Sequence, residues 1–202
     1  MTLWGWLAVL MSITCLVYVW AITIHDFLAK NASVNAPILA IEGYVPDFVL
    51  DSVANLWKND PSLFIVCAGL PIKKGEFCSE YGTEADYNVA VLRIKGVDSL
   101  QVVSAPAQPI NKDRTYTSAL VAKDKLKELG YEPGKVDVVC LGTHARRSQF
   151  LYRKAFKAEW NVGVISYADN DYPEQWWQTS EGARAVVYEM FAYLYCAIFF
   201  HP

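Results

Sequence analysis

The hydrophobic pattern of the chain changes sharply near residue 25. Residues 3–24 read LWGWLAVLMSITCLVYVWAITI and contain no charged side chain. An apolar run of this length crosses the hydrocarbon core of a bilayer as a helix, and tryptophans near both ends suit the two membrane interfaces. A cleaved signal peptide would have a basic start and a shorter apolar core; a buried core helix is the other alternative. We therefore expect an uncleaved single-pass transmembrane anchor over residues 1–28, followed by a short polar linker over residues 29–36.

From residue 37 onward, short apolar runs alternate with longer amphipathic segments. Five runs rich in β-branched residues predict buried strands: residues 38–41, 63–68, 100–103, 136–141 and 162–165. The segments between them have helical spacing: residues 47–58, 84–95, 115–129 and 145–157. Strands and helices that alternate in this way imply right-handed crossovers between parallel strands. The pattern predicts an α/β fold over residues 37–202, namely a three-layer Rossmann-like domain with a mostly parallel sheet of about five strands.

The last helical segment, residues 180–200, carries apolar side chains on all of its faces. A helix of this kind is either buried on both sides or in contact with lipid. Two interpretations stay open. The helix is sandwiched within the domain, or it packs against the anchor or the bilayer surface, with Trp176 and Trp177 at the interface.

Composition excludes several classes of protein. The 202 residues are 53% hydrophobic and 19% charged, which is apolar-rich for a soluble protein. A net charge of −3 gives no basis for a nucleic-acid surface. The three histidines lie far apart without paired-ligand spacing, so we expect no metal site. The chain contains no G-x-S-x-G elbow, P-loop or G-x-G-x-x-G motif and indicates no cofactor.

Glycine and polar residues follow the predicted strands, at the edge where doubly wound sheets bind ligands. The residues that we expect there are Glu42, Gly43, Gly69, Glu84, Arg114, Thr115, Ser118, Thr143, His144 and Arg147. Asp113 fits the N-cap of the helix that carries Thr115 and Ser118, whose hydroxyls would be available to a ligand. Glu42 and Glu84 are candidate acids or bases.

Residues 142–156, GTHARRSQFLYRKAF, begin a helix with basic side chains where the backbone is already positive. Helical spacing puts His144 and Arg147 on the face toward the sheet and Arg146 on another face, so we expect Arg146 to be a solvated surface charge. Two interpretations of the inward pair stay open. It forms a structural ion pair with a protein carboxylate such as Glu42 or Glu84, or it forms a corner that binds a phosphate or carboxylate.

These residues resemble the ElyC/SanA/YdcF family of bacterial envelope proteins, a domain family of unknown function. The matching pieces are ILAIEGYVPD, IVCAG, DRTYTSAL and THARRS. The last two stand for the family motifs N-T-x-x-N-A and H-x-x-R followed by Ala or Ser, although Asp113 and Ser118 stand where many relatives have asparagine. The resemblance implies a Rossmann-like domain tethered to the bacterial inner membrane on the periplasmic side, with a role in cell-envelope or peptidoglycan biogenesis. Carried over to this sequence, it points to Glu42, Gly43, Gly69, Glu84, Thr115, Ser118, His144 and Arg147.

We therefore expect a membrane-anchored envelope protein that binds, and in a wider hypothesis processes, an anionic ligand such as a polyprenyl phosphate or phosphosugar carrier. Arg147 and the helix N-terminus would hold the anion, His144 would act as hydrogen-bond donor or general acid, and Glu84 or Glu42 as base. One alternative is a non-catalytic membrane-tethered scaffold for envelope machinery. Another is a nucleotide-type ligand such as S-adenosylmethionine. The sequence alone leaves open whether the protein is an enzyme and what its oligomeric state is.

Overall fold

The five predicted strands form one parallel sheet with the order β3-β2-β1-β4-β5. The computed structural model describes residues 2–43, 45–72, 80–172 and 175–202. The strands are β1 (Ile38–Glu42), β2 (Phe64–Gly69), β3 (Val102–Pro106), β4 (Lys135–Leu141) and β5 (Asn161–Tyr167). The chain order reverses between β1 and β4, which lie side by side in the sheet. A switch of this kind leaves a crevice at the carboxyl ends of the strands, where doubly wound folds bind ligands.

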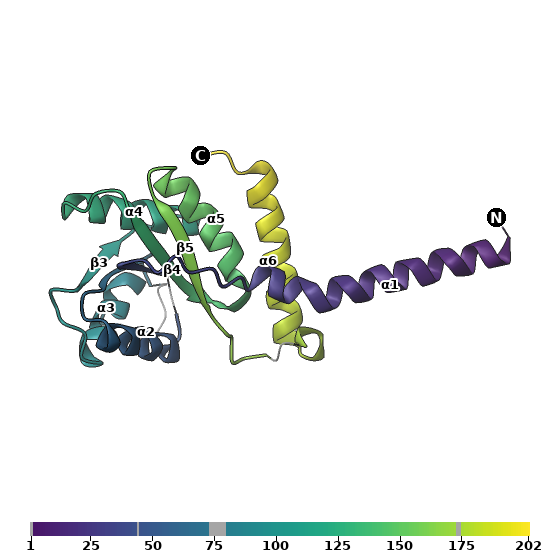
Figure 1. Ribbon diagram of the computed structural model, residues 1–202, viewed down its shortest axis with the longest axis horizontal. Coiled ribbons are helices and arrows are strands. Elements are labelled where there is room, and N and C mark those ends of the chain that lie inside the picture. Colours follow the sequence, from purple (N-terminus) through teal and green to yellow (C-terminus); the bar gives the residue numbers. More distant parts are fainter. Residues whose placement is uncertain (1, 44, 73–79, 173–174) are drawn as a thin grey trace.

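Helices cover both faces of the sheet (Figure 1). They are α2 (Asp47–Asn59), α3 (Glu84–Ile94), α4 (Arg114–Glu128) and α5 (Ala145–Phe156). Alternate residues of a strand point to opposite faces: Leu39 and Ile41 pack with α2 and α3, whereas Ile38 and Ala40 pack with α4 and α5. The predicted three-layer α/β fold with a parallel sheet is therefore confirmed.

One strand begins later than its apolar pattern predicts. β3 starts at Val102, and Leu100, which we expected to begin the strand, is 81% exposed. Asp98 explains the difference, because its carboxylate accepts a hydrogen bond from Leu100 N at 2.8 Å and its carbonyl accepts one from Gln101 N at 2.9 Å. The turn that these bonds form delays the start of the strand.

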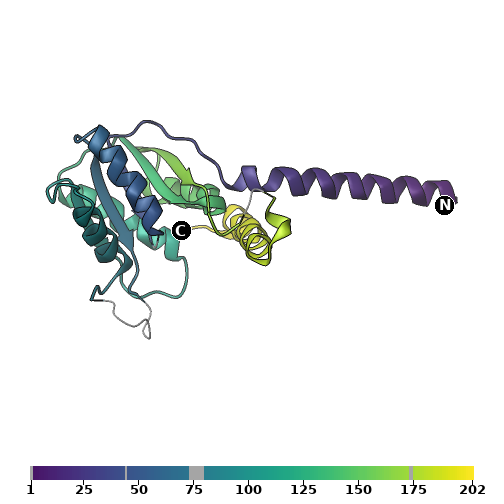
Figure 2. The same cartoon turned by 90° about the horizontal axis from the view of Figure 1, so that it is seen from below.

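The first helix, α1 (Leu3–Leu28), extends away from the domain (Figures 1 and 2). It is long and apolar enough to cross a bilayer, with a mean hydropathy of 2.3 over its most apolar window. Only its C-terminal part is covered by protein, where Ile24 and Leu28 are buried against residues of the C-terminal region. Trp176, in the short helix η2 (Trp176–Gln178), donates a hydrogen bond from Nε1 to Ala21 O at 2.9 Å.

The polar segment after α1 is held against the sheet. Ala32 pairs with Val164 of β5 as an antiparallel bridge, with N–O distances of 2.9 and 3.0 Å. The buried carboxylate of Asp137 accepts three further hydrogen bonds, from Ser33 Oγ at 2.7 Å, Val34 N at 2.9 Å and Ala36 N at 3.0 Å. Backbone and side-chain hydrogen bonds thus tie residues 32–36 to two neighbouring strands.

The last helix, α6 (Ser180–Phe199), agrees in part with each of the two interpretations, because one of its sides packs against protein and the other does not. One side packs against α1 and α5 and buries Val186, Glu189 and Cys196. The opposite side is exposed along the length of the helix. Trp176 is buried beside α1, whereas Trp177 is about half exposed.

Candidate functional site

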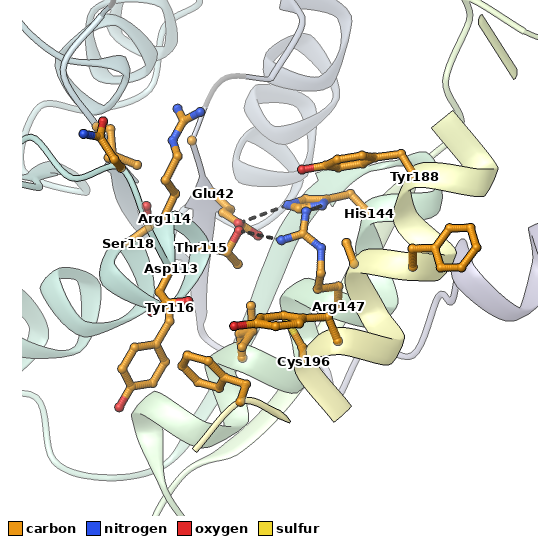
Figure 3. Close-up of a pocket in the computed structure, with 18 of the residues that line it drawn as sticks. Glu42, Asp113, Arg114, Thr115, Tyr116, Ser118, His144, Arg147, Tyr188 and Cys196 are labelled. Carbon is orange, nitrogen blue, oxygen red and sulfur yellow. Dashed lines mark hydrogen bonds and ion pairs between the residues drawn. The ribbon is translucent and has the colours of Figure 1, made fainter. Parts of the chain in front are cut away.

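A cleft of about 680 Å³ opens at the carboxyl ends of the strands, beside the N-termini of α4 and α5 and against α6 (Figure 3). Eight residues predicted from the sequence line it: Glu42, Gly43, Glu84, Arg114, Thr115, Ser118, His144 and Arg147. Two predicted residues lie behind the lining. Gly69 ends β2 next to α3, and Thr143 is buried with its hydroxyl 3.3 Å from the hydroxyl of Tyr172.

Gly69 and Glu84 form a close contact between a strand end and a helix start. A side chain at Gly69 would place its Cβ 2.7 Å from Glu84 Cβ and 2.8 Å from Ala85 N, so only glycine fits. Glu84 Oε2 accepts a hydrogen bond from Leu70 N at 3.2 Å, and its Oε1 lies 3.6 Å from Arg114 Nη2. Glu84 is therefore already engaged with both a backbone amide and a cation of the cleft.

The His144 imidazole lies between two carboxylates. Its Nε2 is 3.1 Å from Glu42 Oε1, and its Nδ1 is 3.0 Å from Glu189 Oε1. Burial alone would lower the pKa of His144, but the charge of Glu42 and the hydrogen bonds to both carboxylates outweigh burial and raise this pKa to about 9. His144 is thus an imidazolium at neutral pH, and each carboxylate accepts one of its two N–H groups.

Arg147 forms a two-pronged ion pair with Glu189 of α6. Its Nε lies 2.8 Å from Glu189 Oε2, and its Nη2 lies 2.9 Å from Glu189 Oε1. Burial would raise the pKa of Glu189, but the hydrogen bonds from Arg147 and His144 lower it to about 2. The basic residues at the start of α5 therefore pair with a protein carboxylate, as the structural ion-pair interpretation predicts. The main partner is Glu189, which the sequence reasoning missed, and not Glu84.

Glu42 lies at the floor of the cleft and is only 6% exposed. Burial would raise its pKa, but the charge and hydrogen bond of His144 outweigh burial and lower it below its ordinary value. One oxygen, Oε1, contacts His144, whereas Oε2 has no hydrogen-bond partner among the described residues. An ionised carboxylate with one unpartnered oxygen can accept a proton from a ligand or from water.

The first turn of α4 faces the cleft without a side-chain cap. Asp113, which we expected to cap this helix, has a left-handed backbone with φ of 56° and makes no capping hydrogen bond. An N-cap residue needs an extended backbone to turn its side chain toward the first amides; the Asp113 carboxylate instead lies 3.9 Å from Lys112 Nζ. The positive end of the α4 dipole is therefore left for another acceptor.

Arg146 is not the solvated charge that its helical position predicts. Its guanidinium lies 3.7 Å from the ring centroid of Phe27 in α1, and its Nε donates a hydrogen bond to the carbonyl of the same residue. The prediction was wrong because α1 passes over this face of α5. The docking of α1 onto the domain cannot be predicted from the spacing of α5 alone.

Part of the cleft wall is aromatic. Tyr188, Phe191 and Tyr195 of α6 line it, together with Tyr116 and Phe200, whose rings are 5.0 Å apart. One cleft thus combines a charged floor with an apolar wall. Within the described part of the chain, no group of three or more His, Cys, Asp or Glu side chains could hold a metal ion.

Comparison with models of known protein families, with curated proteins and with solved structures found no match, so the function must be argued from this geometry.

Proposed function

We propose that this chain is a membrane-anchored cell-envelope protein that binds the phosphorylated head group of a lipid-linked carrier, of the polyprenyl phosphate or phosphosugar type, in the cleft. One observation carries the proposal: the uncapped N-terminus of α4 and the basic side chains face an aromatic wall across one cleft. A ligand that fits has an anionic group at one end and an apolar body at the other.

The first turn of α4 and Arg114 supply the positive potential for the anion. His144 and Arg147 are already balanced by Glu42 and Glu189, so they add little net charge to the cleft. Arg114 is 46% exposed at its side chain and is held only loosely by Glu84 at 3.6 Å. Backbone amides at a helix N-terminus and an adjacent guanidinium are a common phosphate-binding combination.

The aromatic wall supports an apolar body for the ligand. Tyr188, Phe191 and Tyr195 recur on one side of α6, the helix that packs against α1. An isoprenoid chain leaving a bilayer would exchange lipid contacts for these rings without a large loss of apolar contact. A free sugar phosphate would leave the same wall uncovered.

The floor of the cleft also supports proton transfer. In a catalytic extension of the proposal, Glu42 would serve as base and the protonated His144 as acid, once a ligand replaces the hydrogen bonds that they now make. Hydrolysis of a phosphate ester needs both transfers. Binding is the core of the proposal, and hydrolysis is its catalytic extension.

Binding can be tested with the purified full chain in nanodiscs and three probes: a polyprenyl phosphate, the matching uncharged polyprenol, and inorganic phosphate. We expect the polyprenyl phosphate to bind most tightly and Arg114→Gln to weaken it about tenfold, the loss of roughly one charge-assisted contact. Arg93→Gln, at an exposed position on α3, is the matched control. If the polyprenyl phosphate and the uncharged polyprenol bind equally tightly, the cleft does not recognise the phosphate group and this part of the proposal is wrong.

The alternatives predict different results in the same preparation. A scaffold for envelope machinery would retain a co-purifying partner in the His144→Ala and Arg147→Ala variants and lose it when α6 is altered. A nucleotide-type ligand such as S-adenosylmethionine would raise the melting temperature where polyprenyl phosphate does not. Neither has an observation in its favour as specific as the two-sided cleft.

From the resemblance to bacterial envelope proteins we further propose that the domain lies on the periplasmic side of the inner membrane. A reporter enzyme fused after Pro202 distinguishes the two sides. Activity of a reporter that works only in the periplasm is the expected result, and activity only of a cytoplasmic reporter would reverse the orientation.

A further inference from the structure

The exposed side of α6 is an apolar stripe. Six large side chains make it up, each between 44% and 68% exposed: Tyr188, Phe191, Leu194, Tyr195, Ile198 and Phe199. Three of them, Tyr188, Phe191 and Tyr195, also line the cleft, so the stripe borders the cleft mouth. Helical spacing brings all six to one side, opposite the buried Glu189 and Cys196. A contiguous exposed apolar surface of this kind on a folded domain is typical of a site that contacts another protein or a membrane.

The position of α6 relative to α1 indicates which of these covers the stripe. Both views show α6 on the side of the domain from which α1 extends, running across the base of α1 and not along it (Figures 1 and 2). Ile24 and Leu28 near the end of α1 pack in one cluster with Val186 of α6. Whatever surrounds the exposed part of α1 therefore comes close to α6 as well.

The length of α1 places a membrane surface at the same level. Residues 3–24 would span about 33 Å as a helix, close to the roughly 30 Å of a hydrocarbon core. Trp20, near the end of this run, contacts Trp176 at 5.6 Å between ring centroids, and Trp176 contacts Trp177 at 5.8 Å. A tryptophan cluster at this depth is typical of the membrane interface, and α6 begins directly after it.

Cations gather beside the same end of α1. Arg146 lies over Phe27, and Lys30 follows the helix. Burial lowers the pKa of Lys30, and the nearby charges of Arg146 and Arg153 lower it further. Like charges held together at this level are stabilised by anionic phospholipid head groups.

We propose that the exposed stripe of α6 lies in the interface of the bilayer that α1 enters, so that its partner is phospholipid and the cleft opens at the lipid surface. This inference rests on α1 spanning the membrane but not on any ligand of the cleft. Apolar side chains on a helix that lies flat on a bilayer enter the boundary between head groups and acyl chains. A second protein on the stripe would have to fit between α6 and the membrane from which α1 emerges.

Photocrosslinking of the full chain tests this placement. The protein carries p-benzoylphenylalanine in place of Ile198, Leu194 or, as a control, Leu100, which is 81% exposed at a turn before β3. Each form is reconstituted in vesicles of phosphatidylethanolamine and phosphatidylglycerol without any polyprenyl lipid. We expect several-fold more phospholipid adduct at Ile198 and Leu194 than at Leu100. All three sites are exposed, so the substitution does not disturb the core.

The same substitution at Leu16 of α1 checks the premise, because this side chain is 70% exposed on the apolar helix. Lipid adducts at Leu16 with only background at Ile198 and Leu194 would overturn the placement of α6. Crosslinks from Ile198 to a second copy of the chain would overturn it in favour of a protein interface. Lipid adducts at only the background level at Leu16 would show that α1 does not span the membrane, and the inference would then be wrong. None of these results depends on whether the cleft binds a phosphorylated lipid.

Discussion

Arg147 Nη2 lies 2.9 Å from His144 Nδ1, the same nitrogen that lies 3.0 Å from Glu189 Oε1. A guanidinium N–H can donate to Nδ1 only when that nitrogen carries no proton. When His144 is protonated, its N–H points to Glu189 and the contact with Arg147 is no hydrogen bond. The proton on His144 therefore decides which neighbour holds Nδ1, and the network has two hydrogen-bonding arrangements.

Raising the pH should destabilise the protein through His144. Its folded pKa of about 9 is above the ordinary 6.5. The protonated form is thus favoured by folding, and its stabilisation is complete below pH 6.5 and lost as the pH rises through 9. The raised pKa of His144 sets an upper limit of about 3 kcal/mol on the loss of unfolding free energy over this pH range. Urea unfolding in detergent across this range measures it.

The matched variants separate His144 from other titrating groups. His144→Gln should flatten this part of the profile, while His201→Gln, at the exposed C-terminus, should leave it as in the parent protein. A profile that His144→Gln leaves unchanged would assign the loss to another group.

Glu189→Gln should destabilise the protein by about 3–5 kcal/mol, because removing one partner of a buried ion pair leaves Arg147 without its counter-charge. The side chains of Glu189 and Arg147 are only 11% and 15% exposed, so solvent cannot compensate. Glu181→Gln, on the exposed first turn of the same helix, should leave stability nearly unchanged. Denaturant unfolding compares the two, and similar losses would mean that the buried pair has no special importance.

At acidic pH, Glu189 predicts a second loss of stability. Its folded pKa of about 2 is below the ordinary 4.5, so its contribution is complete above pH 4.5 and is lost as the pH falls through 2. Glu189→Gln should remove this part of the acid denaturation curve. An acid limb that is identical in the variant would contradict the assignment.

Gly69→Ala should cost about 1–3 kcal/mol, the usual cost of an added methyl group where the surroundings are close-packed. The new Cβ would meet the α3 backbone at Ala85 N, which cannot move aside as a flexible side chain can. Gly82→Ala is the control, since no atom lies within 4 Å of its Cβ position. Thermal unfolding distinguishes them, and equal melting temperatures would show that α3 gives way freely.

Asp137→Ala should release residues 33–36 from the sheet. The variant loses the acceptor of three hydrogen bonds, and we expect a loss of stability of at least about 4 kcal/mol, since bonds to charged groups contribute roughly 1.5–3 kcal/mol each. Hydrogen exchange at the amides of Val34 and Ala36 should accelerate strongly. Asp124→Ala, on the exposed side of α4, should leave both amides protected. Unchanged exchange in Asp137→Ala would mean that the β5 bridge alone holds the segment.

The fold was predictable because its signals are local. Each strand of a parallel sheet is an apolar run, and each crossover helix has its own period, so the strands and helices could be placed from the residues alone. The residues at the strand ends followed from the topology. Leu100 marks the limit of this approach, because the turn that Asp98 forms with the amides of Leu100 and Gln101 leaves an apolar position exposed.

The site was only partly predictable, because its charge balance comes from a distant element. Glu189 is 42 residues from Arg147 and belongs to the last helix. One signal was present: Glu189 is the only charged residue between Ala185 and Phe200. A carboxylate inside an apolar helix needs a buried partner. Arg146 gave no such signal, because its partner is a ring and a carbonyl at the end of α1.

The attachment of residues 32–36 to β4 and β5 has a geometric consequence for any molecule that the protein acts on. A free segment over residues 29–36 could extend to about 28 Å and let the domain swing around its anchor. The bonds to Asp137 and Val164 remove that freedom. In the proposed function the reach of the cleft is then constant, and a lipid-linked target would have to present its head group at one height above the bilayer.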